Sequence, residues 1–235
     1  MKDPLGDRMK QYEAATTSQT SLNMAPLMVR VDGKRFSSYT KGFTKPYCNA
    51  FIKCMCYTAK QLAKQLQAKV AYVQSDEITF CLRQETYTSQ HIFNGKIFKV
   101  VSCAASYATY FFNKAARKYL PAKYASKVAV FDARAFNVPN IEEATNCILW
   151  RQQDCIRNSI LGLAQYTFGA KNITGVSTLS LKEKLDLSVN NYTNAPEYYK
   201  YGVFILKKDG KYKRKIIDLV TLQFADKVNL FFDTV

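Results

Sequence analysis

Apolar residues along the chain follow two spacings, which predict strands in some segments and helices in others. Short runs rich in β-branched residues predict strands over residues 26–31, 70–73, 78–82 and 128–131, the last ending at residues 132–134. Apolar side chains that recur every three or four residues predict helices over residues 6–16, 49–67, 95–120 and 141–168. A C-terminal β-hairpin is predicted to begin at residues 201–206 and to turn at residues 208–211.

The order of these elements predicts an α+β fold. We expect a palm-like, largely antiparallel sheet of the ferredoxin or RRM type, with helices packed on one face. Residues 1–135 would form this core together with an N-terminal helix. Residues 136–235 would add a helical and β-hairpin part that packs on the core to give a single globular unit.

Composition and charge narrow the class of protein. The chain has 235 residues, of which 48% are hydrophobic, and this is enough to bury a large core. We find no run of about 18 apolar residues and no signal peptide, so we expect a cytoplasmic protein without a membrane partner. Its 34 Lys and Arg against 18 Asp and Glu give a formal net charge of +16, which favours a nucleic acid or nucleotide partner. A soluble protein that simply has many lysines is the alternative.

Histidine and cysteine usage limits the chemistry. His91 is the one histidine and lies in a polar stretch without an evident partner, which argues against Ser-His-Asp and Cys-His mechanisms. The seven cysteines include no Cys-x-x-Cys pair, so we expect reduced thiols and no zinc finger. The chain also has no Gly-x-Gly-x-x-Gly or Walker A motif, so a metal and cationic side chains would have to hold any nucleotide phosphate.

Two short strings place acidic residues at the ends of apolar strands. Asp32-Gly33 follows the first predicted strand, and Gln74-Ser75-Asp76-Glu77 joins the second strand to the third. Asp32, the Gly33 carbonyl and Asp76 could supply the oxygen ligands that Mg²⁺ prefers. Each string alone is also typical of an ordinary turn, in which Asp76 caps the turn and Glu77 is solvated.

Basic residues close to these strings or following later elements are candidates to bind a triphosphate through charge-assisted hydrogen bonds. They are Lys34, Arg35, Lys96, Lys99 and Arg134. For each of them a solvated surface position is the alternative.

Several separated motifs resemble, in order and spacing, those of the tRNA-histidine guanylyltransferase superfamily. The motifs are residues 29–36, 44–46, 74–77, 102–106 and 150–155, and the similarity extends from about residue 7 to residue 202. The resemblance implies a palm-like catalytic domain that adds nucleotides to the 5′ end of tRNA in the 3′-to-5′ direction. It also implies ATP, GTP and other nucleoside triphosphates as substrates, and a homotetramer.

The resemblance further implies roles for individual residues. Two Mg²⁺ ions would be held by Asp32, the Gly33 carbonyl and Asp76, with Glu77 as a supporting catalytic acid. The positions that fall where the superfamily contacts the nucleotide or its triphosphate are Asp32, Gly33, Lys34, Arg35, Phe36, Ser37, Ser75, Asp76, Lys96, Lys99 and Arg134.

Two departures are more similar to the 3′-to-5′ polymerase-like branch of the superfamily, whose activity is templated repair of 5′-truncated tRNA. Ser37 stands where a histidine is usual, and residues 156–159 replace the histidine and paired asparagines of the eukaryotic guanylyltransferases. Two other functions stay open. One is a guanylyltransferase that adds a single G to tRNA-histidine, and the other is a non-catalytic basic RNA-binding protein.

Overall fold

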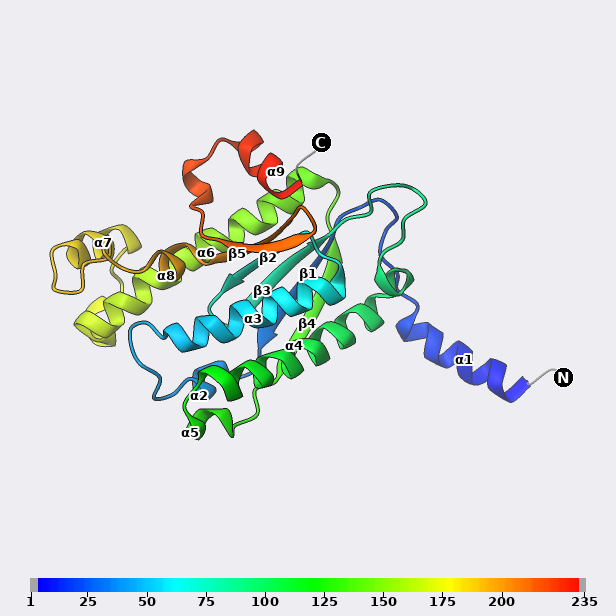
Figure 1. Ribbon diagram of the computed structural model, residues 1–235, viewed down its shortest axis with the longest axis horizontal. Helices are drawn as coiled ribbons and strands as arrows, with labels where there is room; N and C mark the ends of the chain where they lie inside the picture. The colour runs from blue at the N-terminus through cyan, green and yellow to red at the C-terminus, as the bar shows by residue number, and fades with distance from the viewer. Residues whose placement is uncertain (1–3, 233–235) are drawn as a thin grey trace.

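The computed structural model describes residues 4–232, and its centre is one six-stranded antiparallel sheet (Figure 1). The strands lie in the order β4-β1-β3-β2-β5-β6. Their bounds are β1 (Leu27–Gly33), β2 (Val70–Gln74), β3 (Glu77–Leu82), β4 (Phe131–Asn137), β5 (Val203–Lys208) and β6 (Lys211–Lys215). The predicted antiparallel sheet is therefore confirmed, including the hairpin that carries the second acidic string.

Helices α3 (Asn49–Leu66) and α4 (Ile97–Tyr119) cover one face of this sheet. The helices pack closely because α4 turns the small side chains of Ala104 and Ala108 inward, both fully buried. Leu62 of α3 and Phe112 of α4 are also fully buried in the same core. Each such large side chain contributes about 1.5–3 kcal/mol of transfer free energy.

The C-terminal part covers the opposite face with α6 (Ile141–Phe168) and α9 (Phe224–Phe232). Helix α6 has the predicted bounds, and it begins there because the Asn140 side chain accepts a hydrogen bond from the Glu143 backbone N–H. Alternation along β2 divides the residues between the faces, since Tyr72 lies in this second core and Val73 in the first.

The short helices were not predicted, because four to nine residues show too few turns for a clear helical period. They are α2 (Phe36–Tyr39), α5 (Ala122–Ala125), α7 (Thr178–Asp186) and α8 (Glu197–Tyr201), to which η1 (Ile92–Gly95), η2 (Ala170–Ile173) and η3 (Leu219–Thr221) add single 3₁₀ turns. Helix α9 was also missed. In the part of the chain that the structure describes, no helix has the length and apolar character needed to cross a membrane.

The strand predicted at residues 128–131 was wrong by several residues, since β4 starts at Phe131 and runs to Asn137. The Asn113 side chain occupies both backbone groups of Ala129, donating to its carbonyl at 2.7 Å and accepting from its N–H at 3.0 Å. The backbone N–H and carbonyl of Ala129 are therefore both hydrogen bonded to Asn113 and do not pair with a neighbouring strand. The alternation from Phe131 onward, with Asp132 and Arg134 exposed, is the strand signal that was overlooked.

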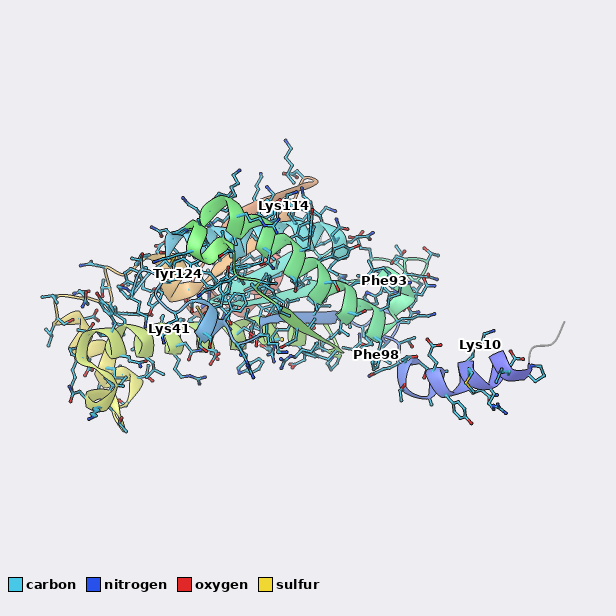
Figure 2. All side chains as sticks on the ribbon, turned by 90° about the horizontal axis from the view of Figure 1, so that it is seen from below. Lys10, Lys41, Phe93, Phe98, Lys114 and Tyr124 are labelled. Carbon is cyan, nitrogen blue, oxygen red and sulfur yellow. The ribbon has the colours of Figure 1, made fainter. Side chains whose placement is uncertain are left out.

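Helix α1 (Pro4–Thr17) extends away from the body of the chain (Figures 1 and 2), and none of its residues is buried. Met9 and Tyr12, which were predicted to share an apolar side, are 45% and 66% exposed. The apolar side of α1 is therefore not covered by any of residues 4–232. An isolated helix of this length is marginally stable in water.

Gln152 joins the C-terminal segments to α6 and is fully buried. Its amide nitrogen donates to the carbonyls of Tyr201 at 2.8 Å and Ile217 at 2.7 Å, and its amide oxygen accepts from the Leu219 N–H at 2.6 Å. Three backbone groups, one buried and two partly buried, therefore depend on one side chain.

We predict that Gln152→Leu lowers the free energy of unfolding by about 3 kcal/mol, since it leaves these backbone groups unpaired. Urea unfolding followed by circular dichroism measures the loss. The neighbouring Gln153 is exposed and provides the matched control, Gln153→Leu, for which we expect a change within about 0.5 kcal/mol. Equal losses in the two variants would contradict the prediction.

Candidate active site

The two acidic strings meet at one end of the sheet. Strands β1 and β3 are antiparallel neighbours, and their register sets Asp32 directly opposite Glu77. The Gly33 N–H also donates to the Asp76 carbonyl at 3.2 Å, so the two turns are joined by a backbone hydrogen bond. Residues more than forty positions apart in the sequence thus form one acidic edge, as the metal-site hypothesis requires.

Gly33 is needed for a local reason. A Cβ atom at this position would lie 2.3 Å from Cδ2 of Phe36, so any other residue would displace that ring. The Phe36 ring contacts four aromatic residues, with centroids 4.9 Å from Phe131 and 5.1 Å from Tyr39. The chain therefore turns sharply after Asp32 and is anchored in the core immediately afterwards.

The Phe36 side chain is 3% exposed and belongs to the core, so it anchors the loop. The residue also lines a hollow beside this turn, and its expected contact with a nucleotide stays a prediction. Ser37 and Ser75 are exposed, and Ser75 adopts a positive φ of 46° in the two-residue turn before β3.

Acidic side chains repeat across three strands at this edge. Asp32 lies opposite Asp132 of β4 on one side and opposite Glu77 of β3 on the other. Burial, followed by the charges of Glu77 and Asp132, raises the pKa of Asp32. Burial is also the largest cause that raises the pKa of Asp76, to about 6, and the nearby Asp32 charge adds to it. Both carboxylates would therefore gain from a neighbouring cation.

The Glu77 carboxylate is bound by neighbouring side chains, and its expected role as a supporting acid stays a prediction. Arg151 of α6 donates from Nε to Oε1 at 2.7 Å and from a terminal nitrogen to Oε2 at 3.0 Å. Gln74 donates to Oε1 at 3.1 Å, and Arg30 lies 3.8 Å from Oε2. The structure gives Glu77 a positioning role that ties α6 to the acidic edge.

Arg151 and Asp154 are the residues that the sequence analysis missed as part of the site. Arg151 also donates to Asp154 at 2.9 Å, and its guanidinium lies 4.5 Å from the centre of the Trp150 ring. Two signals were available, the motif at residues 150–155 and the spacing of three residues on a predicted helix, but that spacing is equally typical of a surface ion pair.

Two hollows flank the acidic turns. The first, of about 530 Å³, lies between the segment 40–48, the start of α3 and the middle of α6. The second, of about 430 Å³, lies over the turn between β1 and α2. Thr40, Phe51, Ser75 and Asp76 line both, so the Asp76 turn separates them. The first hollow contains aromatic side chains, including Tyr47 and Tyr199, whose rings are 4.7 Å apart.

The candidate cations divide into two groups. Arg134 lies beside the acids, because its charge acts on Asp32 and its side chain donates to Asp132 at 3.2 Å. Lys34 and Arg35 are exposed in the turn after Gly33, and Arg35 lines the second hollow.

Lys96 and Lys99 are not brought to the acids within one chain. Lys96 bridges to Thr20, ahead of β1, and Lys99 lies 5.3 Å from the centre of the Phe93 ring. Phe93 and Phe98 appear at the α1 side of the body in Figure 2. The reason is topological, because the loop before α4 leaves the end of β3 that is remote from Glu77.

The donor set at the acidic edge fits a magnesium ion. Asp32 and Asp76 supply two carboxylates, and Mg²⁺ in proteins is usually bound by one or two carboxylates together with substrate phosphates and water. Among residues 4–232 no group of three or more His, Cys, Asp or Glu side chains is arranged to hold a metal. With two carboxylates from the protein, such an ion would take its other ligands from phosphate and water.

Comparison with known proteins agrees with this geometry. Residues 6–139 match the family model of tRNAHis guanylyltransferase. An uncharacterized protein of Acanthamoeba polyphaga mimivirus is 31% identical over 233 residues, covering 88% of this chain and 78% of that protein.

Two similar solved structures are bacterial tRNA(His) guanylyltransferase-like proteins. The one in complex with ATP has a TM-score of 0.82 at 35% identity and covers 91% of both chains. The one in complex with GTP has a TM-score of 0.78 at 30% identity and covers 98% of both. The chain therefore belongs to the tRNAHis guanylyltransferase family, a family of nucleotidyltransferases.

Proposed function

We propose that the chain is a Mg²⁺-dependent 3′-to-5′ RNA nucleotidyltransferase that repairs the 5′ end of truncated tRNA by templated addition. The observation that carries the proposal is that the turns of Asp32 and Asp76 meet beside the hollows, with both acids lining the first hollow and Asp76 also lining the second. One hollow offers aromatic surfaces for a nucleobase, and the other offers Arg35 and exposed serines for phosphates. Similar proteins that bind ATP and GTP support the same substrates here.

The chemistry needs two displacements and no protein nucleophile. In the first, a 5′-monophosphate oxygen of the RNA attacks the α-phosphorus of ATP or GTP, and pyrophosphate leaves. In the second, the 3′-hydroxyl of an incoming nucleoside triphosphate attacks the activated 5′ phosphate, and the nucleoside monophosphate leaves. When bound, Mg²⁺ neutralises charge on the phosphoryl groups. This mechanism suits a chain with a single histidine.

The residues of the site divide the work between binding and positioning. Asp32, the Gly33 carbonyl and Asp76 would hold the metal ions. Arg134 would approach the phosphates beside Asp32, whose charge it already faces. Glu77, which Arg151 holds through two hydrogen bonds, would fix the position of β3 relative to α6 and so keep the Asp76 turn in place.

We also propose that the active form is a homotetramer. The apolar side of α1 supports this, because Leu5, Met9 and Tyr12 are all exposed in the single chain. Exposed aromatic side chains on α4, including Phe98 and Tyr110, add a second uncovered apolar surface.

Replacing either metal-binding acid tests the assignment. We expect Asp32→Asn and Asp76→Asn each to lower nucleotide incorporation by at least about 10²–10³-fold, since each removes a charge that would balance the phosphates. Incorporation of labelled nucleotide into 5′-monophosphorylated truncated tRNA measures the effect. Asp209→Asn is the matched control in the exposed β5–β6 turn and should retain wild-type activity. Full activity in either test variant would overturn the assignment.

The raised pKa of Asp76 makes a pH-dependent prediction for the metal-free protein. The native state binds this proton more tightly than the unfolded state, so the free energy of unfolding falls as pH rises from about 4 to the folded pKa of about 6. Above that pKa the penalty is about 3 kcal/mol. Asp76→Asn should therefore raise the melting temperature at about pH 7.5 in EDTA, and the gain should vanish near pH 4. A gain that is independent of pH would contradict this explanation.

The proposal of templated addition is tested with tRNAs that lack nucleotides at the 5′ end. We expect 5′-monophosphorylated tRNAs lacking one or two nucleotides to receive only the nucleotide that pairs with the opposing 3′ strand, whatever the tRNA identity. Gel analysis of reactions given one nucleoside triphosphate at a time measures this. Addition of one G to tRNA-histidine alone would favour the guanylyltransferase alternative instead. A 5′-triphosphorylated end should bypass the need for ATP in the first step.

A further inference from the structure

One side of α3 carries lysines in a line. Lys53, Tyr57, Lys60 and Lys64 follow one another at intervals of four, three and four residues, so they share one helix face. The three lysines are exposed, and the sequence of α3 contains no Asp or Glu. With a rise of about 1.5 Å per residue, the line from Lys53 to Lys64 is about 16 Å long.

The β5–β6 hairpin continues this line beyond the end of α3. Lys207, Lys211 and Lys213 line a shallow hollow of about 600 Å³ together with Lys60 and Lys64. In Figure 1 the hairpin turn lies beside the C-terminal end of α3. We call the six lysines, Lys53, Lys60, Lys64, Lys207, Lys211 and Lys213, the basic track.

The hairpin is held in this position by a side chain from β6. The Tyr212 hydroxyl hydrogen bonds to the carbonyls of Ala63 at 3.0 Å and Ala68 at 2.9 Å, which lie at the end of α3. The two parts of the basic track are therefore parts of one rigid surface.

Negative charge is scarce around the basic track. Within residues 4–232 none of its lysines forms an ion pair with a carboxylate. The nearby Glu85 is paired with Lys69 and acts on Lys207 only through its charge. Asp209 in the hairpin turn is the other acid of this region. The lysines therefore repel one another unless an external anion binds.

One end of the basic track lies at the end of α3 that borders the active site. Phe51 lines both hollows at the acidic turns, whereas Lys53, two residues later, is exposed on the other side of the helix. The other end of the track lies at the far edge of the sheet, where β6 is the last strand. An elongated polyanion on the track would thus have to pass around this end of α3 to reach Asp32 and Asp76.

A simpler explanation covers only part of the pattern. Lysines on an edge strand prevent sheet-to-sheet association, and this accounts for Lys211 and Lys213 of β6. It does not account for the lysines of α3, which is not an edge element and packs its opposite side into the core.

We propose that the basic track binds the phosphate backbone of the RNA whose 5′ end occupies the acidic turns. The inference rests on the proposed function, since it assigns the path of that substrate across the protein. Lysines bind phosphates as point charges and release condensed counterions, so this contact would supply affinity without sequence preference. Such a contact suits an enzyme that accepts tRNAs of several identities.

A four-residue variant tests the inference. In Lys60→Gln/Lys64→Gln/Lys211→Gln/Lys213→Gln the substituted side chains are exposed, and glutamine is a good helix former, so the fold should persist. With 5′-monophosphorylated truncated tRNA as the probe, we expect the Kd to rise by about tenfold or more at about 0.1 M salt. The slope of log K against log salt should become shallower by about 3, and the Kd for ATP should stay unchanged.

The matched control removes four charges from the neighbouring helices. Lys114, Lys118, Lys123 and Lys127 of α4, α5 and the loop after them are also exposed, and each lies within 6 Å of the centre of a tyrosine ring. Figure 2 shows Lys114 and Tyr124 on the α4 side of the body. We expect their replacement by glutamine to change the Kd for RNA by less than about threefold.

Three outcomes would overturn the inference. They are an unchanged salt slope in the test variant, an equal loss of affinity in the control variant, and a test variant that loses binding to vesicles of anionic lipid but keeps its affinity for RNA. Incorporation by the wild-type chain is measured in parallel. If the wild-type chain incorporates no nucleotide, the proposed function is contradicted. The role of the basic track is decided by the measured RNA affinity alone.

Discussion

The pairing of β1 with β3 is the contact on which the site depends. In the observed register Asp32 lies opposite Glu77, and the Gly33 N–H reaches the Asp76 carbonyl. A shift of one residue would turn Asp32 toward the core and bring Val31 to the acidic edge. The register is secured by the alternation of β1 itself, because Val29 and Val31 are fully buried under α3 and α4. The same strand register is therefore required both for packing of the core and for assembly of the acids.

This arrangement places like charges close together, and a basic residue of α6 offsets part of the negative charge. The two hydrogen bonds from Arg151 to Glu77, with Arg30 nearby, neutralise one of the four acids at the sheet edge, the others being Asp32, Asp76 and Asp132. A largely buried ion pair of this kind contributes little net stability, but loss of one partner leaves a charge without compensation. We infer that its value lies in specificity of position, because it couples α6 to β3, the strand that directly follows the Asp76 turn. Asp32 and Asp76 keep raised pKa values, which a cation beside them would lower.

Helix α3 shows how one element serves the core, the site and the surface. Its inward side contributes Leu62 and Met55 to the core, its first residues line the hollows, and its outward side carries the lysines of the basic track. The strong excess of basic residues is thus organised in part by helical geometry. The C-terminal hairpin extends the same surface because Tyr212 anchors it to the end of α3.

Local patterns in the sequence were sufficient for the antiparallel sheet, for the exact span of α6 and for the two acidic turns. These features follow from spacing within a few residues, which reports side-chain period and turn preference directly. The family resemblance was likewise visible in short strings such as residues 74–77. The start of β4 was missed because its neighbour segment is held by Asn113, sixteen residues away, and no local period encodes that contact.

Only the tertiary structure decided which of the candidate residues act together. Glu77 is held by Arg151, 74 residues further along the chain, so its carboxylate links α6 to the acidic edge. Phe36 became a core residue because three aromatic rings from distant elements pack around it, in addition to that of Tyr39 in its own helix. Lys96 and Lys99 lie away from the acids because the loop before α4 leaves the opposite end of β3. The sequence alone determined which segments could carry chemistry, whereas packing between distant segments determined which side chains meet.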